Sequence, residues 1–105
     1  MSGQSVLRHV VLFQFKDGTS EASVSKIENA FRALPGKIDV IQDFEWGTDV
    51  SVEGLAEGFT HCFFVTFASE ADRDAYLPHP DHTAFGAVLS PHLEKVLVVD
   101  YWQRT

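Results

Sequence analysis

The stretch RHVVLFQFK, from Arg8 to Lys16, has apolar side chains on both faces of the strand that it predicts. His9, Val11, Phe13 and Phe15 fall on one face, and Val10 and Leu12 fall on the other. β-Branched and aromatic residues favour strands, and the Asp-Gly pair that follows is typical of a turn. Because a strand that is apolar on both faces needs cover on both, we expect this one to lie inside a sheet.

A second stretch, THCFFVTFA from Thr60 to Ala68, repeats this two-sided pattern. The remaining periodicity predicts a helix within residues 19–36, a strand from Val40 to Gly47, a helix from Ser69 through Tyr76, a helical piece from Pro80 to about Leu89 and a strand from Leu93 to Gln103. The order β-α-β-β-α-β, with the second helix broken at Pro78, is that of a ferredoxin-like α+β fold with a four-stranded antiparallel sheet. Right-handed crossovers place the two apolar strands in the middle.

The length and charge of the chain limit its organisation and its partners. A chain of 105 residues is long enough for one domain, so we expect a single domain over residues 1–105. The net charge of −7 and the lack of Lys or Arg runs argue against binding to nucleic acid or to an anionic membrane. The chain before Arg8 leaves no room for a secretory leader, and no apolar run reaches membrane-spanning length, so we expect a cytoplasmic protein.

The two-sided apolar strands also predict a homodimer. Two small helices can cover only one face of a four-stranded sheet, and an open face in contact with water is normally polar. Here the second face carries Val10, Leu12, Cys62 and Phe64. We therefore expect two copies to pack with these sheet faces together. The lone cysteine on this face is interpreted as a small buried hydrophobe without a chemical role.

Histidines and a tyrosine are the candidate functional residues. His9 and His61 have the same parity on strands that should be neighbours, so both are expected to face the helices. In YLPHPDHTAF, Pro80 suits the first helical position, which puts His82 in the first turn, where the helix dipole disfavours the imidazolium. A neutral His82 can act as a base near pH 7, and Tyr76 can polarise a carbonyl or hold the imidazole.

Each of these residues also has a purely structural interpretation. A histidine on an apolar strand face is commonly a hydrogen-bonded core residue, and Tyr76 can simply pack its ring in a helix. Asp100 lies on an otherwise apolar face of the last strand, so it needs a partner, and a histidine would serve. We therefore expect Asp100 to pair with one of the histidines.

Metal and cofactor sites are not indicated. His79, Asp81 and His82 contain ligand atoms, but consecutive side chains in a first helical turn diverge, and no further Cys or His pair completes a zinc site. The turn LPGKID offers carbonyl oxygens and Asp39 to a hard cation such as magnesium, which the sequence alone does not establish. We expect no bound cofactor and no dedicated metal ligands.

Four segments in this order, HVVLFQFKDG, DFEWGTDVSVEGLAEGFTH, YLPHPDHTAF and HLEKVLVVDYW, resemble the stress-responsive dimeric α/β-barrel (Dabb) family over nearly the whole chain. The resemblance implies a ferredoxin-like fold whose two sheets pair into a barrel. It also implies a relation to a plant polyketide cyclase of that family, in which His82 matches the base, Tyr76 its partner, and His9 and His61 the pocket histidines. Phe31 stands where that enzyme has a pocket tyrosine, so the same substrate is not expected.

Three classes of function follow from these observations. The first is a cyclase-like or lyase-like enzyme that uses His82 and Tyr76 on a small apolar or aromatic substrate in a pocket lined by His9, Phe31 and His61. The second is a non-catalytic stress-response protein whose stable oligomer is its function. The third is a haem-associated dimeric barrel with a histidine as axial ligand.

Overall fold

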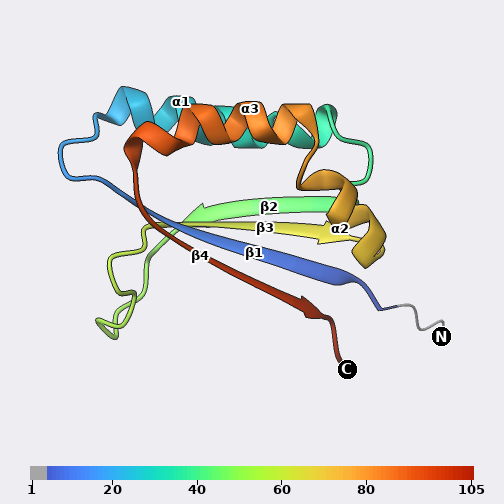
Figure 1. The fold of residues 1–105 in the computed structure, drawn as a ribbon. Coiled ribbons are helices and arrows are strands. Elements are labelled where there is room, and N and C mark those ends of the chain that lie inside the picture. The colour runs from blue at the N-terminus through green and yellow to red at the C-terminus, as the bar shows by residue number, and fades with distance from the viewer. Residues whose placement is uncertain (1–4) are drawn as a thin grey trace.

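The computed structural model describes residues 5–105 and contains one four-stranded sheet with helices on one side (Figure 1). The elements follow one another as β1 (Leu7–Phe15), α1 (Glu21–Arg32), the 3₁₀ turn η1 (Leu34–Gly36), β2 (Asp43–Thr48), β3 (His61–Phe67), α2 (Glu70–Tyr76), α3 (Pro80–Leu89), the 3₁₀ turn η2 (Ser90–His92) and β4 (Leu93–Trp102).

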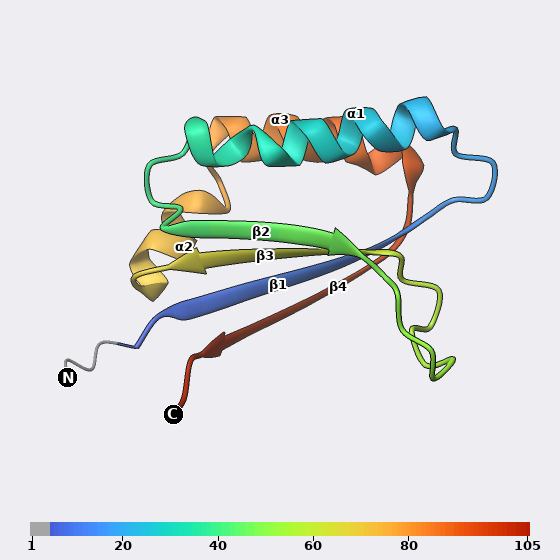
Figure 2. The same ribbon diagram turned by 180° about the vertical axis from the view of Figure 1, so that it is seen from behind.

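The sheet has the strand order β2-β3-β1-β4, and every neighbouring pair is antiparallel. The two strands with apolar residues on both faces, β1 and β3, are therefore central, as predicted. Helices α1 and α3 lie side by side above the sheet in both views, and α2 packs near one end of it (Figure 1, Figure 2). This is the predicted ferredoxin-like α+β architecture.

Local sequence signals fix the helix starts. Ser20 caps α1 by accepting a hydrogen bond from the amide of Ser23, and Ser69 caps α2 by accepting one from the amide of Asp72. Helix α3 begins at Pro80 with His79 as its N-cap, because proline presets the backbone of the first helical residue. The second strand is shorter than the predicted Val40–Gly47, since buried Ile38 holds a turn in which the Ile41 amide bonds to the Ile38 carbonyl.

The face of the sheet that the helices cover, here called the inner face, carries an aromatic core. Phe31 from α1 stacks on Phe63 from β3 with ring centroids 4.2 Å apart, and Phe13 and Phe85 pack around them. Phe63 is completely buried and Phe31 almost so. This layer fills the centre of the space between the sheet and α1 and α3.

The opposite face, here called the outer face, has no cover in the protomer. It is formed by residues that alternate with those of the core, and its apolar members are Val10, Leu12, Cys62, Phe64, Leu97 and Val99. Leu97 and Val99 are 46% and 49% exposed. The predicted two-sided apolarity is therefore present. No helix in residues 5–105 has the length and apolar character needed to cross a membrane.

Candidate functional site

Tyr76 and His82 meet where α2 ends and α3 begins. Pro78 separates the two helices, and the short connection brings the two rings to a centroid distance of 4.3 Å. His82 Nδ1 lies 2.8 Å from the carbonyl oxygen of Leu77. Because a carbonyl can only accept, Nδ1 must carry the proton, and the neutral ring then has its lone pair on Nε2. The imidazole is thus held in the tautomer whose Nε2 can take up a proton.

The hydroxyl of Tyr76 is buried and has no hydrogen-bond partner among the described residues. Tyr76 itself is fully buried. Burial raises the pKa of Tyr76 above its ordinary value, so the hydroxyl stays protonated at neutral pH and remains a donor. A buried hydroxyl without a hydrogen-bond partner destabilises the folded protein. One explanation is that a polar atom of a bound ligand accepts this hydrogen bond.

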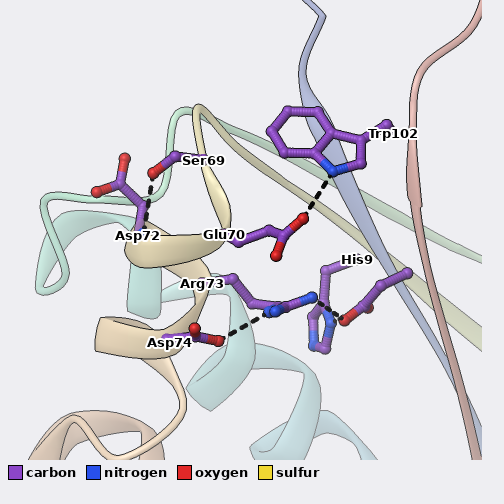
Figure 3. A network of polar contacts seen from close by, with 8 residues as sticks. His9, Ser69, Glu70, Asp72, Arg73, Asp74 and Trp102 are labelled. Atoms are coloured by element: carbon purple, nitrogen blue, oxygen red, sulfur yellow. Dashed lines mark hydrogen bonds and ion pairs between the residues drawn. The ribbon is translucent and has the colours of Figure 1, made fainter.

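His9 approaches Tyr76 from the sheet. Its ring lies 5.9 Å from the Tyr76 ring in an edge-on arrangement, and its Nδ1 is 2.6 Å from Asp100 Oδ1. The second oxygen of Asp100 accepts a hydrogen bond of 3.1 Å from Arg73, which also contacts Asp74 (Figure 3). The predicted pairing of Asp100 with a histidine is confirmed, and β1, β4 and α2 are joined through it.

Arg73 was not among the residues that the sequence indicated. It lies three residues before Tyr76 on α2, so the two side chains share one side of the helix. The contact between Arg73 and Asp100 could have been predicted from this spacing, because Asp100 on an apolar strand face needs a partner. Glu28, which bonds to His61, was missed in the same way although it lies three residues before Phe31 on α1.

His61 and Phe31 do not lie beside this pair. His9 is opposite Val65 in the β1–β3 register and His61 is opposite Phe13, a separation of four residues along the strands, or about 13 Å at the usual rise. Both nitrogens of His61 are engaged, Nε2 with Glu28 at 2.7 Å and Nδ1 with Thr60 at 2.8 Å. The structure thus brings together His9, Tyr76 and His82, puts Phe31 in the aromatic core and leaves His61 at the other end of the sheet.

The residues considered for metal binding have other contacts. His79 Nδ1 accepts a hydrogen bond from the amide of Asp81, while His82 donates to a carbonyl. Asp39 is exposed, and the neighbouring Leu34 carbonyl accepts from the amides of Lys37 and Ile38. Within the described part of the chain, no three His, Cys, Asp or Glu side chains gather in a group that could hold a metal.

Two hollows are present away from this cluster. The larger, of about 690 Å³, lies against the outer face beneath the connection between β2 and β3. The smaller, of about 310 Å³, lies between α1 and the end of α3, with Lys26 and His92 in its wall. Neither of these two hollows is lined by His9, Tyr76 or His82.

Replacing Asp100 by Asn is expected to destabilise the protein, because this carboxylate serves both His9 and Arg73. Charged hydrogen bonds of this kind contribute about 1 to 3 kcal/mol, and we expect the lower end because the Asp100 side chain is 26% exposed. Urea denaturation measures the change. Asp74→Asn is the matched control, since Asp74 contacts the same arginine but is 63% exposed. Equal losses in the two variants would contradict the proposed importance of the buried pair.

Comparison with known proteins identifies the family. The family model described as "Stress responsive A/B Barrel Domain" matches residues 7–103. The chain is 39% identical to the stress-response A/B barrel domain-containing protein HS1 of Arabidopsis thaliana, over 90% of this chain and 87% of the relative. It is 35% identical to olivetolic acid cyclase of Cannabis sativa, over 93% of this chain and 97% of the enzyme.

Solved structures agree with this assignment. Hydroxynitrile lyase from Passiflora edulis superposes with a TM-score of 0.90 at 29% identity, covering 97% of this chain and 96% of that one. A dimeric ferredoxin-like protein of unknown function from Thermobifida fusca superposes with a TM-score of 0.80 at 28% identity, covering 94% of this chain and 92% of that one. With a family model that spans almost the whole domain and relatives above 30% identity over nearly their full lengths, the chain belongs to the stress-responsive A/B barrel domain (Dabb) family.

Proposed function

We propose that this protein is a small lyase or cyclase that makes or breaks a carbon–carbon bond at a carbonyl carbon of a small apolar or aromatic substrate. The observation that carries the proposal is the pairing of a buried, unpartnered Tyr76 hydroxyl with a His82 ring whose Nδ1 is bonded to the Leu77 carbonyl. Two relatives of this chain are named as a cyclase and a lyase, which supports the same class of chemistry.

The two side chains have complementary roles in such a reaction. In the condensing direction, Nε2 of His82 removes a proton from the carbon next to one carbonyl, and the resulting carbanion attacks a second carbonyl carbon. The electron pair of that second C=O moves onto its oxygen, where the Tyr76 hydroxyl donates a hydrogen bond. The imidazolium then returns its proton to this oxygen. In the lyase direction the same steps run in reverse, so no other reactant is required.

Binding of an aromatic aldehyde tests the proposal without knowledge of the natural substrate. Benzaldehyde offers a flat apolar ring and one carbonyl acceptor, so we expect it to shift the imidazole resonances of His82 in a saturable NMR titration. Tyr76→Phe removes the donor and is expected to weaken binding about tenfold, in line with the loss of one hydrogen bond of about 1.4 kcal/mol. Tyr101→Phe, the same change at a tyrosine on the outer face of β4 and therefore on the opposite side of the sheet from His9, is the matched control and is expected to leave binding unchanged. Absence of any shift at His82 would count against the enzyme.

A non-catalytic stress-response protein is the second candidate, and one observation favours it. Phe31 and Phe63 lie parallel to within 1° at 4.2 Å, so the centre of the inner face is already filled by core packing. In that case Tyr76 and His82 serve only to join α2 to α3. A protein that binds no aldehyde but remains a stable oligomer would favour this alternative.

For either function, we further propose that the protein works as a homodimer through the outer face. Leu97, Val99 and Tyr101 are exposed there beside half-buried Leu12 and Phe64. Contiguous apolar surface of this kind is uncommon on monomers and typical of interfaces. Burial chiefly, and the charge of Glu45 secondarily, raise the pKa of the Cys62 thiol on this face, so it stays uncharged and suits a dry contact.

A further inference from the structure

His61, the first residue of β3, has hydrogen-bond partners at both of its ring nitrogens. Its Nε2 lies 2.7 Å from Glu28 Oε2 of α1, and its Nδ1 lies 2.8 Å from Thr60 Oγ1. The ring packs edge-on against Phe15 at a centroid distance of 5.0 Å and parallel to Trp46 at 6.2 Å. The His61 side chain is only 8% exposed, so packing and hydrogen bonds together fix its orientation.

The direction of these two hydrogen bonds follows from the carboxylate. The ionised Glu28 side chain can only accept, so Nε2 of the neutral His61 ring carries the proton. Nδ1 then holds the lone pair and accepts a hydrogen bond from the Thr60 hydroxyl. His82 is held the other way, with its proton on Nδ1. Nδ1 of His61 is therefore placed to take up the proton of the Thr60 hydroxyl.

This series of three groups has the order that activates a hydroxyl nucleophile. In such sites a histidine takes the proton of a serine or threonine, and a carboxylate on the far ring nitrogen holds the required tautomer and stabilises the imidazolium. Thr60 is exposed, whereas the side chains of His61 and Glu28 are 8% and 22% exposed. The hydroxyl is thus accessible, while the pair behind it is largely shielded from water.

The hollow of about 690 Å³ offers room for an acyl group beside this hydroxyl. Thr60 and His61 both line it in the protomer. Its wall also contains the apolar side chains of Leu12, Phe64 and Leu97. A small apolar acyl group can therefore lie against the wall while its carbonyl carbon faces Thr60.

Polar groups around the hollow limit the kind of ester that fits. Thr48 is exposed, lies opposite His61 in the β2–β3 register and lines the same hollow, so its hydroxyl is available to donate to an oxygen that gains charge. The acidic residues that line the hollow are Glu45, Asp49, Glu53 and Glu57. Lys95, which donates to the Glu57 carbonyl, offsets only one of these charges. An ester without negative charge is therefore favoured.

We propose that Thr60, His61 and Glu28 form a second reactive site, at which Thr60 takes the acyl group of a small uncharged carboxylic ester. This inference does not rest on the chemistry proposed for the cluster between α2 and α3. Thr60 is the nucleophile and His61 its base, while Glu28 is a positioning residue that acts through the imidazole.

The reaction uses only the ester and water. The Thr60 oxygen attacks the carbonyl carbon while its proton passes to Nδ1 of His61, and the Thr48 hydroxyl donates to the oxyanion that forms. The bond from that carbon to the leaving oxygen then breaks, and the leaving oxygen keeps the electron pair and takes the proton from Nδ1. Water releases the acyl group from Thr60 by the same steps, which yields the carboxylic acid and restores the hydroxyl.

The tautomer of His61 is the first test, because it requires no substrate. Nitrogen NMR at neutral pH distinguishes the two ring nitrogens, and we expect the proton of His61 on Nε2 and that of His82 on Nδ1. Glutamine can donate as well as accept, so Glu28→Gln is expected to give a mixture of both His61 tautomers. A proton on Nδ1 of His61 in the unmodified protein would overturn the proposal, because that nitrogen could not take the proton of Thr60.

Reaction of the full-length protein with p-nitrophenyl acetate tests the chemistry. We expect p-nitrophenol to be released and an acetyl group to be found on Thr60 by mass spectrometry after an acid quench. Thr60→Val keeps the shape of the side chain and is expected to abolish this adduct. Glu28→Gln is expected to slow acylation at least about tenfold, because the imidazolium loses its carboxylate. Thr19→Val, the same change at a hydroxyl that donates to the Lys16 carbonyl, is the matched control and is expected to react normally.

The outcomes decide whether the three groups act together. Slower acylation of Thr60 in a Glu28→Gln protein that keeps its circular dichroism spectrum supports the site. Acetyl groups found only on lysines or on Cys62, or equal acylation of Thr60 in Glu28→Gln, would overturn it and leave His61 as a join between α1 and β3. If Glu28→Gln fails to fold, the His61 tautomer of the unmodified protein and the Thr60→Val adduct still decide the question.

Discussion

Leu12→Asp is expected to convert the protein from a dimer to a monomer at micromolar concentration. Leu12 lies on central strand β1 in the middle of the outer face, opposite Cys62 and Leu97 in the register. In the dimer a carboxylate there would lose its water without gaining a partner, which costs several kcal/mol. A loss of about 3 kcal/mol raises the dissociation constant roughly a hundredfold. Phe64→Asp on neighbouring β3 is expected to act in the same way.

Sedimentation velocity with circular dichroism measures both the mass and the fold of these variants. Leu77→Asp is a suitable control, since Leu77 is 42% exposed but lies at the end of α2, away from the outer face. It is expected to stay dimeric, which excludes a general effect of a new surface carboxylate. An unmodified protein that sediments as a monomer of ordinary stability would refute the dimer directly.

The sheet could be predicted from sequence because its signals are local and agree with one another. The two-sided apolar pattern of β1 and β3 identified the central strands, and Ser69 and Pro80 identified the starts of α2 and α3. The pairing of Asp100 with a histidine followed from the cost of an unpaired carboxylate on an apolar face. The order of the elements and the apolar character of the outer face could be predicted from the same strand and helix patterns.

The layout of the candidate site was less predictable, because parity fixes the face of a strand but not the position along it. His9 and His61 share the inner face, yet the register sets His61 opposite Phe13 and leaves it with Glu28 and Thr60. The Leu77 carbonyl that selects the His82 tautomer is a backbone group and carries no sequence signal. Its position depends on the bend at Pro78, which sequence marks only as a helix break.

His82→Ala is expected to abolish most turnover while leaving the fold and the dimer intact. Alanine favours helices and His82 is only half-buried, so α3 still begins at Pro80 with His79 as its cap. Removing a general base typically costs about 10²- to 10⁴-fold in rate. Tyr76→Phe keeps the ring against His82 but removes the donor, and because His82 still moves the proton we expect a smaller loss in kcat.

The assay uses a hydroxynitrile such as mandelonitrile. Its cleavage needs a base, His82, to remove the hydroxyl proton, and the bond to the nitrile carbon then breaks with its electron pair leaving on cyanide. The imidazolium passes the proton to cyanide, which leaves as HCN, while Tyr76 donates a hydrogen bond to the oxygen that becomes the carbonyl of benzaldehyde. His92→Ala is the matched control, since His92 lies in η2 beside the smaller hollow and away from Tyr76. Full activity in His92→Ala with a loss of at least about a hundredfold in His82→Ala would assign the proton transfer to the ring held by Leu77. Should His82→Ala turn over as fast as the unmodified protein, the proline-flanked histidine serves only the join between α2 and α3, and the non-catalytic dimer becomes the better description.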